Sequence, residues 1–199
     1  MPAFTRRRTL AGALAAAALP RNAWGAPRRY RIAPEEAEIR FIFTANGNAQ
    51  TGTAPLSRAD LRIDPDNLQA STAEVTADIS RAKAGIFLVT QALKTPEMLD
   101  AARHPTALFR STGVTLGAAG RISEGAVITG ELTLKGTTRP VRFDAAIYRP
   151  PGSAPDDLDR LEAHLTGRIS RASFGITGFP DMVADTVGLD IRVRIRAID

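Results

Sequence analysis

Near its carboxyl end the chain reads Val187-Gly188-Leu189-Asp190-Ile191-Arg192-Val193-Arg194-Ile195-Arg196. Aliphatic residues take every second position, and glycine, aspartate or arginine takes the positions between them. Because successive side chains of a β-strand point to opposite faces of a sheet, five aliphatic side chains share one face here and the charges share the other. The stretch therefore predicts an antiparallel strand with one buried face and one face in water.

The same alternation recurs from Pro27 onward and is interrupted by turn residues about every ten positions. It predicts clear strands at Ile39–Phe43, Leu61–Asp64, Val75–Ile79 and Val141–Ile147, and weaker ones at Thr106–Leu116, Ala126–Leu134 and Leu161–Ile169. Glycine, proline, asparagine and aspartate mark turns at Asn46-Gly47-Asn48, Asp64-Pro65-Asp66-Asn67, Gly117–Gly120 and Lys135-Gly136, and an exposed connection from Pro150. The total is about eight or nine strands.

Two segments depart from this period. Gly85–Arg103 has apolar residues at helical spacing, with Thr95 as a cap and Pro96 at a first-turn position, and it predicts one helix or two short ones. Ser170–Phe174 predicts a short helical turn. We expect an all-β fold, an antiparallel barrel of about eight strands with a short helical insertion, because closure removes exposed sheet edges. The alternative is a two-sheet sandwich.

The first 25 residues have the organisation of an export signal. Arg6-Arg7-Arg8 precedes a small apolar run, Ala11–Leu19, and Ala23-Trp24-Gly25 or Trp24-Gly25-Ala26 offers a cleavage site, after Gly25 or after Ala26. The apolar run is too short to span a bilayer, and Pro20 ends it. The arginines resemble the twin-arginine signal, which implies export of a folded precursor to the periplasm. We expect residues 1–25 to be a cleaved signal peptide and residues 26–199 to form the barrel domain.

Composition excludes several classes of protein. The chain of 199 residues has no cysteine and two histidines, which removes disulfides, thiolate catalysis and zinc fingers. The net charge is +5, but the signal holds four arginines and no acid, so the remainder has 22 bases against 21 acids, or +1. No basic run is interleaved with aromatics, and no nucleic-acid partner is expected. Neither the acidic pairs nor the separated His104 and His164 indicate catalysis or metal binding.

Four stretches resemble the YceI-like family in their order. They are Tyr30–Phe41, Leu93–Phe109, Gly130–Val141, which is the most specific, and Gly167–Ile176 ahead of the final strand. The resemblance implies a lipocalin-like barrel exported by bacteria that holds an isoprenoid chain, a polyprenyl lipid or a quinone-like molecule, and is not an enzyme. Histidines common in the family are replaced at Glu36, Ala45 and within Val89–Leu93.

An interior that binds such a chain must be dry, elongated and lined by apolar side chains. The candidate inward residues are Phe41, Phe43, Phe87, Leu93, Met98, Leu99, Phe109, Leu132, Leu134, Phe143, Ile147, Phe174, Phe179 and Met182. The first hypothesis is a periplasmic carrier that uses no cofactor or metal and touches a membrane transiently. The alternative is an exported barrel with a filled core that acts through its surface as an interaction or stress-related module. The sequence does not indicate an oligomeric state.

Overall fold

The computed structural model describes residues 27–64, 67–117, 125–154 and 157–198. The expected signal peptide falls outside these residues, so its cleavage stays a prediction. Within the described chain there are one α-helix, α1 (Phe87–Leu93), and 3-10 turns at Pro34–Glu36, Leu68–Ala70 and Ala172–Phe174. The described strands are β1 (Arg28–Arg31), β2 (Ala37–Ala45), β3 (Asn48–Thr53), β4 (Leu56–Ile63), β5 (Thr72–Asp78), β6 (Lys83–Ala84), β7 (Thr106–Leu116), β8 (Ala126–Leu134), β9 (Thr137–Tyr148), β10 (Arg160–Ser170) and β11 (Thr186–Ile198).

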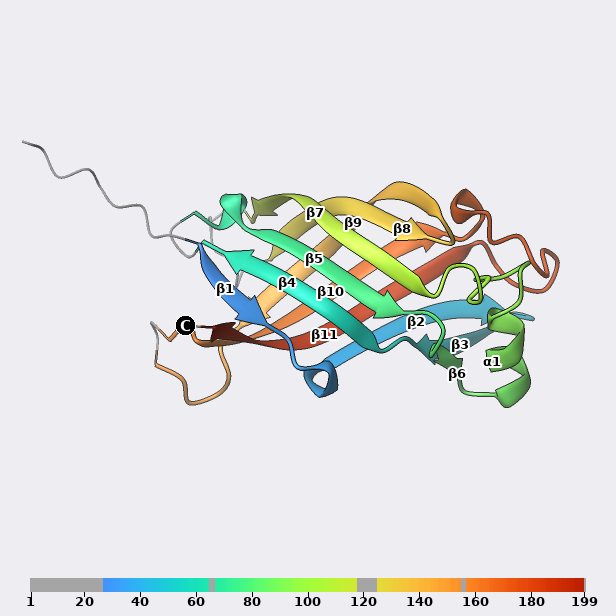
Figure 1. Ribbon diagram of the computed structural model, residues 1–199, viewed down its shortest axis with the longest axis horizontal. Coiled ribbons are helices and arrows are strands. Elements are labelled where there is room, and N and C mark those ends of the chain that lie inside the picture. The colour runs from blue at the N-terminus through green and yellow to red at the C-terminus, as the bar shows by residue number, and fades with distance from the viewer. Residues whose placement is uncertain (1–26, 65–66, 118–124, 155–156, 199) are drawn as a thin grey trace, which may run out of the picture.

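Eight of these strands close into an antiparallel barrel. The order β1-β4-β5-β7-β8-β9-β10-β11 returns to β1, because β1 pairs with β4 on one side and with β11 on the other (Figure 1). Strands β2, β3 and β6 extend the sheet from β11. One edge of β11 therefore carries β2 along residues 188–193 and β1 along residues 196–198. The predicted barrel is confirmed, and the sandwich alternative is wrong.

Strand β11 has the predicted two faces. Val187, Leu189, Ile191, Val193 and Ile195 all line the interior of the barrel. The arginines between them are exposed. Arg194 pairs with Glu162 on β10, and Arg196 pairs with Glu36 in the 3-10 turn before β2. Eleven residue pairs join β11 to β10. The burial of alternate aliphatic side chains thus fixes the register of the strand at the centre of the fold.

Two hairpin turns have the backbone that their sequences demand. Asn46 and Gly47 join β2 to β3 with φ of 50° and 76°, and Lys135 and Gly136 join β8 to β9 with φ of 49° and 72°. Two successive positive φ angles define the type I′ turn, whose twist matches the twist of the flanking strands. The predicted helical insertion is shorter than expected: α1 ends at Leu93, and Thr95–Arg103 forms turns instead.

A polar cluster on the outer face joins three strands. Arg40 of β2 donates to Asp190 Oδ2 of β11 at 2.7 Å, and His164 Nε2 of β10 lies 3.0 Å from Asp190 Oδ1. Burial raises the pKa of Asp190, but the hydrogen bonds from Arg40 and His164 outweigh it, so the pKa lies below its usual value. His164 therefore faces outward.

Replacing Asp190 by asparagine should make the free energy of unfolding depend less on pH in the acid range. The depressed pKa means that the carboxylate stabilises the fold above its unfolded pKa of about 3.9, and this contribution disappears as pH falls through the lower folded-state value. We expect Asp190→Asn to lower the free energy of unfolding by about 1 kcal/mol at neutral pH. Urea unfolding of both proteins from neutral pH to about pH 2.5 should show the difference between their free energies of unfolding shrinking as the pH falls. A difference that stays constant would contradict a lowered pKa for Asp190.

Candidate ligand-binding cavity

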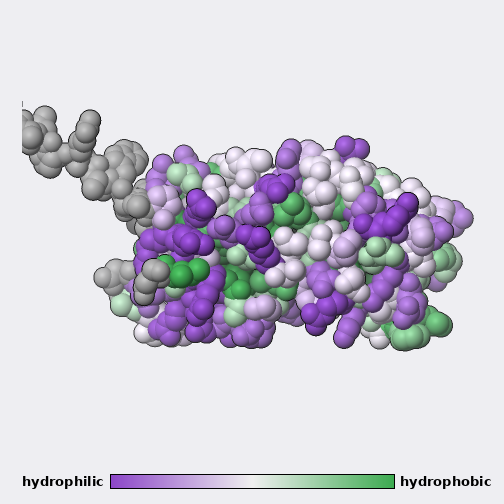
Figure 2. Space-filling model, viewed as in Figure 1, coloured by the Kyte–Doolittle hydropathy of each residue, from purple (hydrophilic) through white to green (hydrophobic). Residues whose placement is uncertain are grey.

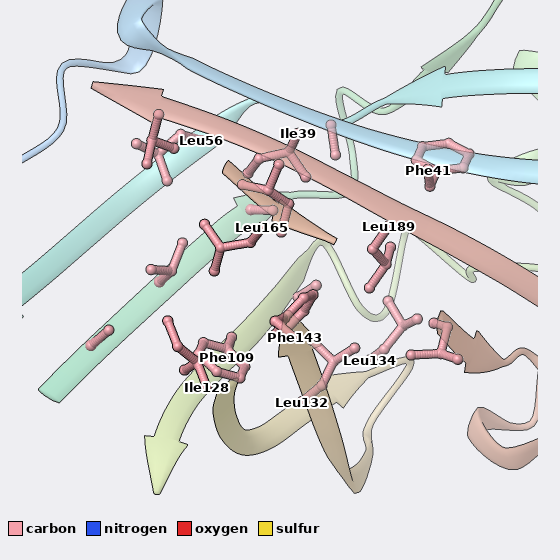
Figure 3. Close-up of a pocket in the computed structure, with 18 of the residues that line it drawn as sticks. Ile39, Phe41, Leu56, Phe109, Ile128, Leu132, Leu134, Phe143, Leu165 and Leu189 are labelled. Atoms are coloured by element: carbon pink, nitrogen blue, oxygen red, sulfur yellow. The ribbon is translucent and has the colours of Figure 1, made fainter. Parts of the chain in front are cut away.

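The interior of the barrel is hollow. A cavity of about 300 Å³ runs between the strands, and its wall is made almost entirely of aliphatic and aromatic side chains. Figure 3 shows these side chains converging from strands all around the barrel, among them Phe41, Leu165 and Leu189. Within the described chain four polar residues share the wall: Ser71, Thr72, Ser111 and Arg171. Such a wall suits a hydrophobic occupant and offers little to orient a polar one.

The hollow separates two packed clusters. One includes Leu93, Met98, Phe174 and Ile176 near α1. The other joins Tyr30, Leu61, Leu161 and Ile195, where β1 closes the barrel. Both clusters contribute residues to the cavity wall, and side chains between them, such as Leu165 and Ile191, stay half-buried although they point inward. The barrel is thus packed toward its two ends and open in its middle.

Three wall phenylalanines lie flat against glycines of the next strand. A Cβ on Gly167 would sit 2.8 Å from Phe143 Cδ1, and Cβ atoms on Gly52 and Gly130 would overlap the rings of Phe41 and Phe109 in the same way. The Phe109 and Phe143 rings also meet edge to face, with centroids 5.4 Å apart. Because glycine has no Cβ, the three aromatic rings can pack against the backbone of the next strand and leave the cavity open.

A methyl group at Gly167 should push the Phe143 ring into the cavity. The new Cβ would also meet Arg142 O at 2.9 Å, so the backbone must shift as well. We expect Gly167→Ala to cost about 1 to 3 kcal/mol of stability. Gly85→Ala is the control, since no atom lies within 4 Å of its Cβ position. Thermal unfolding measures the effect, and a Gly167→Ala protein as stable as the parent would disprove the role of this contact.

The segment after α1 forms one end of the cavity wall. Leu93, the last residue of α1, is buried in the wall, and Met98 and Leu99 follow it there. The turn is held by Asp100, which has a φ of 50° and whose backbone N–H donates to Thr95 O at 2.9 Å. A hydrogen bond from Arg103 at 2.7 Å keeps the pKa of the Asp100 carboxyl below its usual value.

The guanidinium of Arg171 is buried at the same end and holds a loop in place. It donates to four backbone carbonyls: Ile176 O at 2.9 Å, Gly178 O at 2.7 Å, Val183 O at 2.8 Å and Ala184 O at 3.2 Å. These acceptors belong to the connection between the 3-10 turn at Ala172–Phe174 and β11. Ile176 and Val183 in turn line the cavity. Arg171 thus fixes the part of the wall that this loop supplies.

Ten of the fourteen sequence-predicted residues lie together in the cavity wall: Phe41, Phe43, Leu93, Met98, Leu99, Phe109, Leu132, Leu134, Phe143 and Ile147. They come from β2, α1 and the turn after it, β7, β8 and β9. Their contact with a ligand stays a prediction. The structure also places in the wall many aliphatic residues that were not singled out, including Ile39, Leu56, Leu165, Leu189 and Ile191. For all of these but Leu56, which lies outside the predicted strands, alternation along a predicted strand was the available signal.

Four predicted residues do not line the cavity. Phe87 is 72% exposed, because only the last turn of α1 reaches the barrel and the first turn faces solvent. Phe179 and Met182 are exposed on the loop that Arg171 holds. Phe174 is 1% exposed but packs within the cluster near α1, outside the cavity wall. Phe87, Phe179 and Met182 therefore do not point inward, whereas Phe174 points into the packed core beside the cavity. Contact of these four residues with a ligand stays a prediction.

The positions of the missing family histidines lie away from the middle of the cavity. Glu36 pairs with Arg196, Ala45 forms a bridge with Val183, and Ala92 belongs to α1. Arg139, in the most specific of the resembling stretches, is exposed and donates to Ser173 O at 3.1 Å, so it ties β9 to the 3-10 turn. Among the described residues no group of three or more His, Asp or Glu side chains has the geometry to hold a metal ion.

No helix in the described parts of the chain is long and apolar enough to cross a membrane. The fold and the site define a closed antiparallel β-barrel with an apolar internal cavity. The chain belongs to the YceI-like family, because a model of the YceI-like domain matches residues 30–195.

Relatives and solved structures agree with this membership. A UPF0312 protein of Pseudomonas putida (strain W619) is 35% identical over 49% of this chain and 48% of its own length. A UPF0312 protein of Pectobacterium carotovorum is 32% identical over 58% and 57%. The chain therefore matches about half the length of these curated relatives.

The fold itself is shared with solved structures. Burkholderia cenocepacia BcnA matches with a TM-score of 0.71 at 17% identity, covering 82% of this chain and 98% of that one. A Campylobacter jejuni YceI protein matches with a TM-score of 0.57 at 20% identity, covering 73% and 84%.

Proposed function

We propose that the protein binds one hydrophobic chain of the isoprenoid class, a polyprenyl lipid or a quinone-like molecule, inside its barrel. The observation that carries the proposal is the cavity of about 300 Å³ with its almost wholly apolar wall. The alternative, a module that acts through its surface, would be favoured by close packing across the barrel. The hollow middle of the barrel supports the binding proposal instead. No chemical step on the ligand is needed, so the proposed protein is a carrier and not an enzyme.

The driving force for binding is removal of the ligand from water. Each methylene buried in an apolar wall contributes about 0.8 kcal/mol. The cavity volume lies at the lower end of the range of about 300 to 1,000 Å³ for small-molecule sites. One short isoprenoid chain fits this space, and a longer one must extend past an end of the barrel.

The first experiment is to identify what the protein carries. The processed protein is purified from the periplasm, extracted with organic solvent, and the extract is analysed by mass spectrometry at measured stoichiometry. A near-equimolar isoprenoid or quinone supports the proposal and identifies the ligand. In parallel, geraniol, farnesol and geranylgeraniol are titrated. Affinity should rise with each isoprene unit until the cavity is full. An extract without lipid, together with no rise in melting temperature on addition of any of the three alcohols, would refute the proposal.

The proposal includes a periplasmic location reached by the twin-arginine route. Replacing Arg6, Arg7 and Arg8 by lysine keeps the charge of the signal but removes its arginines. We expect the triple variant to accumulate unprocessed in the cytoplasm, while the parent is found processed in the periplasm. Cell fractionation and the mass of the processed chain measure this. Export of the lysine variant at the parental rate would exclude the twin-arginine route.

A further inference from the structure

The most exposed large apolar side chains of the described residues are consecutive. Ile86, Phe87 and Leu88 are 56%, 72% and 75% exposed, and they form the N-terminal end of α1. Figure 2 shows them as a hydrophobic patch over α1 at one end of the barrel. Two further exposed apolar residues, Phe179 and Met182, lie on the loop at the same end (Figure 1). Single exposed apolar residues are ordinary, but a run of three on one helical turn marks an interaction surface.

The segment of the sequence that carries this patch is basic. Residues 79–96 contain Arg81, Lys83 and Lys94 and no acid. Lys83 forms β6 directly before α1, and Lys94 caps the other end of the helix. The third and last lysine of the chain, Lys135, is at the same end and donates to Gly175 O at 2.8 Å. Acidic groups at this end include Asp78 and Asp100, which accept hydrogen bonds from Arg81 N–H and from the Arg103 guanidinium, and Glu97 and Asp181, which are exposed. All four lie outside residues 79–96, which carry the patch.

The patch continues into the cavity wall. The same short helix exposes Phe87 and Leu88 at its start and buries Leu93 in the wall at its end. Met98 and Leu99 extend the wall, and the Gly178 N–H donates to Glu97 O at 2.9 Å, which joins this segment to the loop held by Arg171. A surface at this end is therefore less than two turns of helix away from the proposed ligand.

From these three observations we infer that the α1 end of the barrel docks on an anionic phospholipid bilayer. Ile86, Phe87 and Leu88 insert among the acyl chains, while Arg81, Lys83 and Lys94 contact the lipid phosphates. Apolar insertion combined with lysine contacts is the chemistry of reversible binding to a membrane surface. This inference deepens the proposed function, since it places the cavity next to the membrane from which a lipid-like ligand comes.

Vesicle co-sedimentation of the full processed chain tests the inference. Vesicles of phosphatidylcholine with phosphatidylglycerol are compared with vesicles of phosphatidylcholine alone. The parent should bind the anionic vesicles, and Phe87→Ser/Leu88→Ser should bind them at least tenfold more weakly. Lys83→Glu/Lys94→Glu should lose the preference for anionic vesicles. Tyr148→Ser is the matched control, because it removes an apolar side chain that is 52% exposed at the far end of β9.

Ligand binding in solution separates this inference from the proposed function. Phe87 and Leu88 do not line the cavity, so Phe87→Ser/Leu88→Ser should keep the parental affinity for geranylgeraniol and the parental melting temperature. A parent that binds geranylgeraniol but no vesicle overturns the docking inference alone. A parent that forms a dimer without vesicles, which Phe87→Ser/Leu88→Ser dissociates, also overturns it, because the patch is then covered by a second copy. If neither ligand nor vesicle binds, both proposals fail.

Discussion

Leu165→Trp should weaken the binding of geranylgeraniol at least tenfold and leave the barrel folded. Leu165 lies in the middle of β10, points into the cavity, and is flanked by Ala145 on β9 and Ile191 on β11. Its half-buried state shows that there is empty space in front of it. An indole would occupy that space, so the ligand would lose the apolar surface that it buries there. Filling a cavity without strain costs little stability, and we expect a change within about 1.5 kcal/mol.

Thr166→Trp is the matched control for Leu165→Trp. Thr166 is the next residue on β10, and its exposed side chain points away from the cavity. It should bind geranylgeraniol as the parent does. The only tryptophan of the chain is Trp24, so residues 26–199 contain none, and the emission of each introduced indole reports on its surroundings. The Leu165→Trp emission should be that of a buried indole. Undiminished ligand affinity in Leu165→Trp would mean that the ligand does not occupy the middle of the barrel.

Arg171→Met should produce the largest loss of stability among single changes at the site. The substitution leaves four carbonyl oxygens, those of Ile176, Gly178, Val183 and Ala184, without their donor. Each unsatisfied buried polar group costs about 1 to 3 kcal/mol, and water reaching a loosened loop recovers part of it. We expect a loss of about 3 kcal/mol or more.

Two variants and one local measurement make the Arg171 prediction specific. Arg171→Lys keeps the charge but offers three donors from one point in place of a planar fork, so it should recover part of the loss. Arg168→Met removes an exposed arginine from β10, the strand that ends just before Arg171, and should change stability by less than about 0.5 kcal/mol. Amide hydrogen exchange should accelerate in residues 176–184 of Arg171→Met before it does in β10 or β11. Parental exchange in this loop would show that other contacts hold it.

The strands were predictable where both faces have a clear character. β7 and β8 have the bounds that the sequence predicted, and β11 was evident from its alternation. β1 and β6 are too short, at four and two residues, to display a period, and β3 is polar with a glycine at its barrel-facing position. The helix was predicted too long because apolar residues at helical spacing continue past Leu93, where a turn brings Met98 and Leu99 to the cavity wall instead.

The cavity was predictable in part. A residue on a strand is oriented by its neighbours, so Phe41, Phe109 and Phe143 were assigned inward from alternation alone. Phe87 and Phe179 lie on a helix and a loop, where orientation depends on tertiary contacts that no period encodes. Arg171 had no local signal at all, since its four acceptors lie five to thirteen residues further along the chain.

The strand that closes the barrel also sets when the barrel can form. Arg29 and Tyr30 of β1 pair with Ile198 and Ala197 of β11, which is the last described strand, so closure joins the two extremes of the described chain. Contacts between such distant residues form late in folding. The wall of the barrel therefore stays open during synthesis. A closed interior of the size of a ligand does not exist until β11 has been synthesised. Whatever occupies the cavity must therefore be acquired after β11 has paired with β1.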